Sequence, residues 1–430
     1  MQIQTTGGLE INANNSIIEN NKIINNYNGL TILSENNLIN NNNITNNTNY
    51  GIYVTGLNNK IINNIINTSQ GTIGILAENI PSNLLIDSNM ITGPTPVNNA
   101  CIEFDNTDQS NISFNNITTD CDSGIFFKKT QQIGSSTYNI IKGNKINQNY
   151  RGIYFIEALN NKITNTLISA NTKGIVFQNG TQTDPGSDNN IIQDSVISSD
   201  EHDIYYSKRS GNNTLINTTF NISKVDSDGG NLTVKWYLDV YINDSNGNNA
   251  NNIMVGGYDK NNNLEFTTTT NASGNIKTRI VEELSFLPDP PPPPLFQYVY
   301  KTNYTITASN SSYKATAAVN LTESKSITLT IEPVPLNVHN LSLLNSSGNN
   351  GIFEFLITNQ LAVNINDISW QFDTKDNNII SSLQNVNLTP GETIFAYLKH
   401  NFTTSSSYNV NANVTNGSLQ DSINLNVTIT

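Results

Sequence analysis

The stretch "NNKIINNIIN", residues 58–67, is built from asparagine and isoleucine with one lysine. Its core is the pattern I-x-x-N-x-I, formed by Ile61, Asn64 and Ile66. The same pattern begins at Ile18, Ile39, Ile86, Ile112 and Ile141, and three further copies that begin at Ile163, Ile192 and Leu215 replace the amide by a hydroxyl. Self-similarity of this kind along a chain predicts a repeat architecture.

A second motif, of the form G-I-x-V, falls between these copies. It reads GLEI at 8, GLTI at 29, GIYV at 51, GILA at 74, CIEF at 101, GIFF at 124, GIYF at 152, GIVF at 174 and DIYY at 203. One such unit holds two short strand signals and cannot bury its apolar face alone, whereas stacked copies can. We therefore predict a parallel β-helix of about nine coils over residues 1–222, with coils ~4.8 Å apart.

The asparagine of the first motif keeps one position in six consecutive coils. Asn tolerates the left-handed backbone conformation that a bend between strands requires. Stacked amides can also donate to and accept from each other along the axis. We predict an internal ladder made of Asn21, Asn42, Asn64, Asn89, Asn115 and Asn144. The alternative is that an Asn-rich chain places Asn at every kind of position.

Composition narrows the class of protein. Charged residues make up 13% of the chain, the formal net charge is −13 and the pI is about 4.6. No stripe of Lys and Arg is available to neutralise phosphates, which argues against nucleic-acid partners, and the acidic balance argues against an anionic membrane surface. No stretch approaches the ~18 apolar residues of a membrane span.

The repeats resemble the right-handed parallel β-helix proteins of the pectin-lyase-like superfamily. Within it they are most similar to the carbohydrate-binding and sugar-hydrolase (CASH) repeats shared with the NosD periplasmic family. The resemblance covers residues 1 to about 222 and implies the fold, while the activity stays open because the scaffold carries many functions. Three histidines, no HExxH and no CxxC pair give no reason to expect copper or zinc, despite the NosD resemblance.

Two further domains are predicted after a polar linker at residues 221–231. Longer alternating strands over residues 223–333 predict a β-sandwich, and residues 240–280 resemble immunoglobulin-like or carboxypeptidase-regulatory-like modules. "EPVP", residues 332–335, marks a second boundary, and residues 334–430 resemble the immunoglobulin-like adhesion modules of archaeal and bacterial surfaces. "PDPPPPPL", residues 288–295, predicts a polyproline spacer or partner site. We expect the chain to be part of a longer protein.

One outward row of the G-I-x-V strands raises the question of an enzyme. Glu78, Asp105 and Lys128 follow each other on consecutive coils, with Glu103 beside them. Neighbouring carboxylates and a cation can perturb each other's pKa values. Pectate-lyase-like enzymes bind calcium with such clusters and use a basic residue as the base. The competing interpretation, which we favour, is a solvated row in which Lys128 offsets Asp105. We therefore expect no cofactor, with calcium as the alternative.

The other outward row is rich in aromatic residues and is the predicted ligand-binding row. It contains Tyr53, Phe126, Tyr154 and Tyr205, whose rings could stack on the apolar faces of sugars. Two insertions, residues 128–139 and 178–189, could form the walls of a notch beside it. The alternative is that a loop, another domain or a neighbouring subunit covers the row.

The sequence also suggests an extracellular setting. Cys101 and Cys121 are the only cysteines, and we expect them to form a disulfide rather than remain two small apolar residues. The chain holds 23 Asn-x-Ser/Thr sequons, which fits a glycoprotein.

Together these features predict an all-β, multidomain, extracellular or cell-surface protein with a structural or adhesive role. Its expected partner is a polysaccharide or a cell-surface glycan, with no nucleic acid and no membrane insertion. The alternatives are a polysaccharide lyase or glycoside hydrolase that acts on the β-helix face, and a self-associating subunit of a surface layer or filament.

Overall fold

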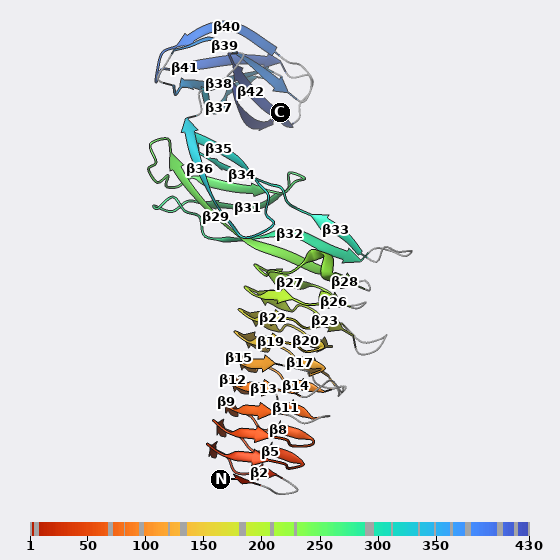
Figure 1. Ribbon diagram of the computed structural model, residues 1–430. Coiled ribbons are helices and arrows are strands. Elements are labelled where there is room, and N and C mark those ends of the chain that lie inside the picture. Colours follow the sequence, from red (N-terminus) through yellow and green to blue (C-terminus); the bar gives the residue numbers. More distant parts are fainter. Residues whose placement is uncertain are drawn as a thin grey trace. The chain divides into compact units, whose positions relative to one another are not determined.

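The fold was analysed in a computed structural model that describes residues 2–3, 8–67, 72–80, 82–93, 99–118, 121–129, 136–179, 186–206, 210–227, 230–288, 296–310, 313–333, 336–347, 350–361, 364–374, 380–401, 407–416 and 420–428. Within these residues the chain is almost entirely β-strand, with one short 3-10 helix at Ile222–Lys224 (Figure 1). In the part of the chain described, no helix has the length and apolar character needed to cross a membrane. The chain divides into two compact units.

The first unit contains a parallel β-helix in which each coil contributes one strand to each of three sheets. Sheet A contains β1 (Gln2–Ile3), β4 (Lys22–Ile24), β7 (Asn43–Thr45), β10 (Ile65–Asn67), β13 (Met90–Thr92), β16 (Asn116–Thr118), β19 (Lys145–Asn147), β22 (Leu167–Ser169) and β25 (Val196–Ser198). Sheet B contains β2 (Leu9–Ile11), β5 (Asn28–Ile32), β8 (Tyr50–Val54), β11 (Ile73–Glu78), β14 (Ala100–Asp105), β17 (Ser123–Lys128), β20 (Arg151–Ile156), β23 (Lys173–Gln178), β26 (His202–Tyr206) and β28 (Val225–Ser227). Sheet C contains β3 (Ile17–Glu19), β6 (Leu38–Asn40), β9 (Lys60–Ile62), β12 (Leu85–Asp87), β15 (Asn111–Ser113), β18 (Ile140–Lys142), β21 (Lys162–Thr164), β24 (Ile191–Gln193), β27 (Asn213–Ile216) and β29 (Leu232–Asp244).

The interior is formed by columns of apolar side chains, several of which are isoleucine from coil to coil. Ile61 pairs with Ile86 and Ile86 pairs with Ile112 in the parallel register, and all three are fully buried. In sheet B one inner column changes from small aliphatic residues to stacked aromatic rings, with the Phe127 and Phe155 centroids 5.1 Å apart. The predicted parallel β-helix of about nine coils is confirmed by this register.

The predicted asparagine ladder lies at the corner between sheets C and A. The backbone N–H of Asn64 donates to Asn89 Oδ1 at 2.9 Å, and its Nδ2 donates to the same oxygen at 3.0 Å and to Ile39 O at 3.0 Å. Equivalent backbone-to-Oδ1 bonds join each step from Asn21 to Asn144. Each amide thereby satisfies polar groups that the turn would otherwise leave unpaired.

The ladder asparagine was expected to adopt the left-handed backbone conformation at the bend. The structure shows that another residue does so. Positive φ angles fall one position earlier, at Asn20, Asn41, Asn63, Ser88, Phe114 and Gly143. The two tasks are separate because the left-handed residue turns the chain outward, and the next residue then aims its amide into the corner. The outward residue can therefore vary, while the inward one needs an amide or a hydroxyl.

A second corner, between sheets B and C, carries asparagine steps that the sequence pattern did not single out. The backbone N–H groups of Asn139, Asn161 and Asn190 each donate at 2.9 Å to the Oδ1 of the asparagine one coil further on, at Asn161, Asn190 and Asn213. Asn37 donates to Asn59 Oδ1 at 2.8 Å in the same way. Asparagine therefore supports more than one edge of the coil.

A disulfide joins adjacent coils near the start of sheet B strands β14 and β17. Cys101 and Cys121 are bonded, with their Cα atoms 5.7 Å apart. Cys101 occupies the position that is glycine in most copies of the G-I-x-V motif. The bond therefore adds a covalent link between two coils that backbone hydrogen bonds already join.

The first unit extends beyond residue 222, where the β-helix was expected to end. It contains Met1–Tyr237, Ile280–Thr302 and Leu321–Lys325. The reason is that β28 and the first residues of β29 continue the parallel sheets, with Ile204 beside Val225 and Leu215 beside Val234. The hairpin of β32 (Arg279–Pro288) and β33 (Phe296–Tyr300) joins this unit, and Trp236 Nε1 donates to Glu283 Oε2 at 2.5 Å.

The second unit consists of antiparallel sheets. One has the order β31 (Leu264–Thr269), β30 (Met254–Tyr258), β34 (Tyr304–Ser309) and β35 (Tyr313–Val319), and β36 (Lys325–Pro333) pairs with β35 at one end. Two further sheets contain β37 (Leu336–Ser347), β38 (Asn350–Asn359) and β41 (Thr393–Asn401), and β40 (Ile380–Leu388), β39 (Ile365–Thr374), β42 (Ser407–Thr415) and β43 (Gln420–Thr428). Their shared core includes Phe353 and Phe355 from the first and Trp370 and Val414 from the second, as expected for a β-sandwich.

The predicted polyproline stretch lies largely outside the described residues, because residues 289–295 are not described.

Candidate functional site

The outer face of sheet B brings the predicted aromatic row into one column. The parallel register places Tyr53, Leu76, Glu103, Phe126, Tyr154, Val176 and Tyr205 on seven consecutive coils. Because these sheet B strands stack one above the other, the column follows the axis of the β-helix. The order of the outward positions is therefore the one expected from the motif.

Exposure along this column differs from the expected open strip. Leu76, Glu103 and Val176 are only 7%, 5% and 2% exposed. Tyr53, Phe126, Tyr154 and Tyr205 are partly exposed. The accessible surface is thus broken into separate ring edges. Half of each insertion expected to wall a notch lies outside the described residues, at 130–135 and 180–185.

Phe126 and Tyr154 form a closely stacked pair of rings on the face. Their centroids are 4.8 Å apart and their planes differ by 9°, so they stack along the axis. The Arg151 guanidinium lies over the Tyr154 ring, with Cζ 4.5 Å from the centroid, and forms an ion pair with Asp122. The Tyr154 hydroxyl donates to Gln178 Oε1 at 2.6 Å. Each ring therefore has one face against the other ring, and Arg151 lies over Tyr154, so the pair presents ring edges and polar groups as well as ring surface.

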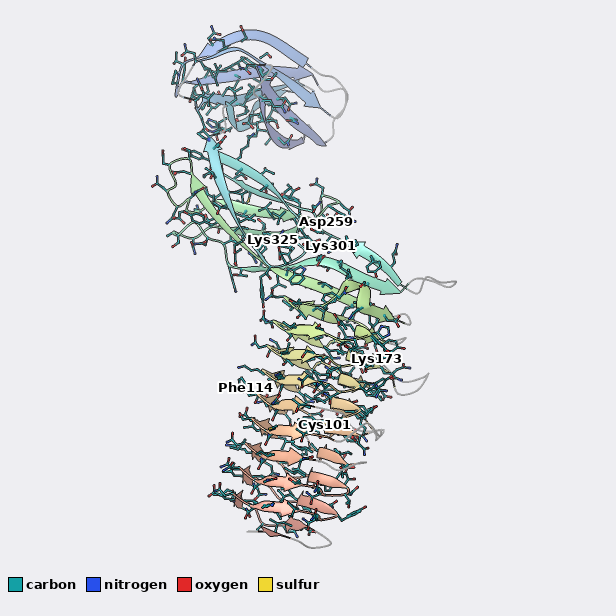
Figure 2. All side chains as sticks on the ribbon, viewed as in Figure 1. Cys101, Phe114, Lys173, Asp259, Lys301 and Lys325 are labelled. Carbon is teal, nitrogen blue, oxygen red and sulfur yellow. A yellow bond between two sulfur atoms is a disulfide. The ribbon has the colours of Figure 1, made fainter. Side chains whose placement is uncertain are left out.

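The rings at the two ends of the column have different partners. Tyr53 donates to Glu78 Oε2 at 2.6 Å, and burial together with this bond raises the pKa of the Tyr53 phenol. The Tyr205 ring has the Lys173 Nζ 4.8 Å from its centroid. Lys173, which is labelled on the β-helix in Figure 2, occupies the strand position of Arg151 one coil later. Cations therefore accompany the aromatic column on two consecutive coils.

The predicted charged row forms a compact network. Lys128 Nζ lies 2.5 Å from Glu103 Oε1 and 3.4 Å from Asp105 Oδ2. Glu103 and Asp105 are each only 5% exposed, so the row is not the solvated one that was favoured from the sequence. Glu78 stands beside Asp105 on the preceding coil. The positive charge of Lys128 does lie beside the carboxylates, as the favoured interpretation expected.

Burial and ion pairing shift the pKa values of Glu103 and Lys128 in opposite directions. Burial raises the pKa of the Glu103 carboxyl above its ordinary value, and the ion pair with Lys128 opposes the rise only in part. Burial alone would lower the pKa of Lys128, but the bonds and charges of Glu103 and Asp105 outweigh it and raise that pKa. Among the described residues, no group of three or more His, Cys, Asp or Glu side chains is placed to hold a metal ion.

Three members of the site were missed from the sequence: Asp122, Arg151 and Gln178. Arg151 and Lys173 each precede the glycine of a G-I-x-V copy, in "RGIY" and "KGIV". That position forms a third outward column, and reading it would have identified both cations. Asp122 could not be found in this way because it lies in the turn before β17.

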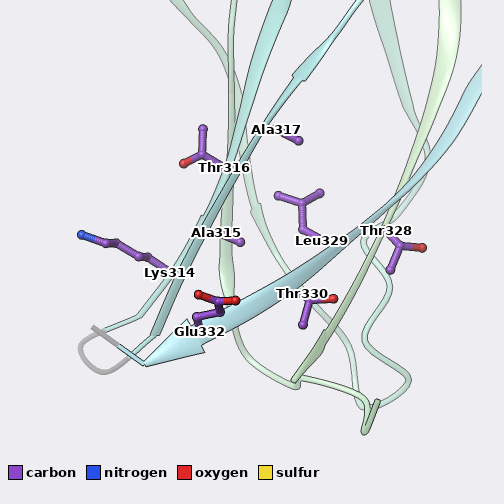
Figure 3. A pocket seen from close by; sticks show the side chains of 8 residues that line it. All are labelled: Lys314, Ala315, Thr316, Ala317, Thr328, Leu329, Thr330 and Glu332. Atoms are coloured by element: carbon purple, nitrogen blue, oxygen red, sulfur yellow. The ribbon is translucent and has the colours of Figure 1, made fainter. Parts of the chain in front are cut away.

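A separate hollow of about 330 Å³ lies between β35 and β36 (Figure 3). The two strands pair at Tyr313 with Pro333 and at Lys314 with Glu332. The hollow is lined by residues 314–317 of β35 and by residues 328–330 and 332 of β36. It has no aromatic lining, and none of the predicted site residues lies there.

The chain is similar to one protein family over part of its length and to several solved structures. The family model described as "Protein of unknown function (DUF1565)" matches residues 85–225. No curated protein matches the sequence. Among solved structures, the chain is similar to a putative carbohydrate binding protein from Bacteroides uniformis (10% identity, 45% of this chain and 98% of that chain, TM-score 0.23). It is also similar to a double mutant of the tailspike protein of E. coli bacteriophage HK620 in complex with pentasaccharide (11% identity, 61% of this chain and 70% of that chain, TM-score 0.29). A third similar structure is ORF18 of Geobacillus virus E2 (11% identity, 76% of this chain and 62% of that chain, TM-score 0.31).

Proposed function

We propose that this chain is an extracellular structural or adhesive protein whose sheet B face binds a glycan. The β-helix supplies a stiff support, because each coil is bonded to the next through three sheets and through corner amides. The following sandwiches act as further modules of the same polypeptide. The proposed partner is a polysaccharide or a cell-surface glycan.

The observation that carries the proposal is that the Phe126–Tyr154 pair lies between two clusters of charged side chains. On one side lies the Lys128 network with Glu103, and on the other lies the Arg151–Asp122 ion pair. Binding sites for small organic ligands combine apolar surface with a few fixed polar groups. Ring edges flanked by charged donors and acceptors fit a ligand that has both C–H surfaces and hydroxyls.

The disulfide supports the proposed location outside the cell. Structural disulfides persist in oxidising compartments and are rare in reducing ones. The ion pairs of the charged network favour binding over cleavage, because both Glu103 and Asp105 are bonded to Lys128 and neither is left as an uncommitted acid or base.

The test is the double substitution Phe126→Ala and Tyr154→Ala in the full chain. Affinity is measured from retention in native gels that contain a polysaccharide bound by the wild type. We expect the double variant to lose about tenfold in affinity, as for loss of a central aromatic contact. The matched control is Tyr27→Ala, an exposed tyrosine before β5, four coils away from Phe126. Retention of the double variant equal to wild type across neutral and acidic polysaccharides would overturn the proposal.

A further inference from the structure

The hollow between β35 and β36 separates two strands that pair at one end only. The pair Lys314–Glu332 is the last one before the strands part (Figure 3). Residues 315–319 of β35 and 326–331 of β36 are all described, and none of them pairs with the opposite strand. The strands separate because β35 pairs with β34 in one sheet, whereas β36 pairs with β29 in another. Two strand edges therefore face each other across a hollow of about 330 Å³.

The β35 edge lacks the features that usually protect an exposed strand. Native proteins blunt their sheet edges with charged side chains, with bulges or with a covering segment. Residues 315–319 are Ala, Thr and Val, and residues 326–331 are Ser, Ile, Thr and Leu, so neither free edge carries a charge. The pairing of β35 with β34 also runs without a register shift. The backbone of this edge is thus open to another strand.

The opposite edge of the same sheet, formed by β31, is protected. It carries Glu265, and its pairing with β30 shifts register between Gly257 and Tyr258. Arg279 Nη2 donates to Thr267 O at 3.4 Å, so a side chain also engages the backbone of β31. One sheet therefore has one protected edge and one edge that faces a hollow, and the second is the one suited to a partner.

The lining of the hollow defines the chemistry of that partner. Backbone N–H and C=O groups along a free strand edge pair with another extended strand. On the inner side Leu329 is buried and Ala315 and Ala317 are half-buried, and these two small side chains leave room for apolar side chains from an incoming strand. On the outer side Thr316 and Thr330 are exposed. The strand that fits alternates apolar residues with polar, uncharged ones.

The size of the hollow favours a single free segment over a second copy of this chain. A strand that already belongs to a sheet brings its neighbours with it, as β35 would bring β34. A hollow of about 330 Å³ has no room for more than one strand. An extended segment outside any sheet meets no such obstacle, and five residues of it would span ~17 Å along the β35 edge.

We propose that the hollow between β35 and β36 binds an extended, uncharged segment of another polypeptide by strand addition. The segment pairs with the free edge of β35 and becomes the fifth strand of the sheet β31–β30–β34–β35. Its apolar side chains lie over Leu329 and Ala317, and its polar side chains face solvent beside Thr316. This inference is independent of the glycan site proposed on sheet B.

The test measures binding of a fluorescein-labelled peptide, Thr-Val-Thr-Val-Thr-Val-Thr, to the full chain by fluorescence anisotropy. Two matched peptides are N-methylated, one at the valines and one at the threonines, so each keeps its side chains but loses the backbone donors of one edge. We expect the unmethylated peptide to bind. At least one methylated peptide should bind about tenfold more weakly, because several backbone hydrogen bonds are lost together.

A substitution in the protein tests the location of the site. Ala317→Phe places a ring in the hollow and should weaken binding of the unmethylated peptide by about tenfold. The matched control is Ala318→Phe, which adds the same ring at the next residue, an exposed position outside the lining of the hollow. Binding to the control should equal binding to wild type.

The comparison of the three peptides on the wild-type chain stays decisive if Ala317→Phe disturbs folding. The proposal is overturned if the unmethylated peptide does not bind, or if both methylated peptides bind as tightly as it does. Equal weakening by Ala317→Phe and Ala318→Phe overturns it as well. So does a wild-type dimer in light scattering that Ala317→Phe converts to a monomer, because a second copy would then be the occupant.

Discussion

At the scale of the residue, the coil separates two roles that asparagine could fill together. The outward residue of the C–A corner has positive φ and can be Asn63, Ser88 or even Phe114. The next residue is buried and bonded to both neighbouring coils, as Asn64 and Asn89 are. Gly143 shows how the outward position adjusts to its neighbours, because a Cβ there would lie 2.6 Å from the Phe114 ring. The inward amide is thus the more constrained of the two.

Asn64→Leu should lower the free energy of unfolding by ~1–3 kcal/mol, because the substitution leaves buried polar groups of adjacent coils without partners. Chemical denaturation followed by circular dichroism measures the change. The control is Asn63→Gly. It replaces an exposed residue whose φ is 55° by one that adopts positive φ freely. Equal stability of Asn64→Leu and wild type would contradict the ladder's structural role.

Glu103→Gln tests the sign of the pKa shift in the charged network. A carboxyl whose folded pKa is raised above its ordinary 4.5 stabilises the fold most below pH 4.5, and this contribution is lost as pH rises through the folded pKa. Glutamine does not titrate. The melting temperature of wild type relative to the variant should therefore fall as pH rises above about 4.5. A melting temperature of wild type that rises relative to the variant over that range would contradict the prediction. It would show that the ion pair with Lys128 affects the pKa of Glu103 more than burial does.

At the scale of the element, coils are joined by parallel strands, by corner amides and, at one place, by a covalent bond. The three sheets carry the inward isoleucines in register, so each coil buries its neighbours' side chains. Turns in the second unit use a different device. Asp244 and Asp259 each accept from the backbone N–H groups two and four residues later, which closes their hairpin loops in the same way. Local side-chain bonds shape these hairpins, whereas contacts between coils shape the β-helix.

Reduction of the Cys101–Cys121 disulfide should lower stability. The bond joins residues separated by 20 in sequence, and the chain-entropy model assigns about 3 kcal/mol to a loop of that size. Thermal unfolding with and without dithiothreitol measures the effect, and the double variant Cys101→Ser and Cys121→Ser should show no response to the reductant. Two free thiols in the oxidised, denatured protein would show that the bond is not formed.

At the scale of the whole molecule, the division into units follows contacts rather than sequence order. Residues 280–302 and 321–325 belong with the β-helix although residues 238–279 lie in the other unit. A single boundary near residue 222 does not describe this division. The first residues of β29 pair within the parallel sheet, and the rest of the strand belongs to the other unit.

The sequence by itself determined the coil and the direction of its side chains. Repeats of Ile and Asn at nearly constant spacing define which residues stack, and the alternation within a strand defines which point outward, so the ladder positions and the order from Tyr53 to Tyr205 could be predicted. Tertiary structure alone decided how exposed those outward residues are, that Arg151 covers Tyr154, and that Lys128 binds both Glu103 and Asp105. The physical reason is that periodicity specifies direction from the axis, whereas exposure and pairing depend on side chains that neighbouring coils and distant segments bring beside each position.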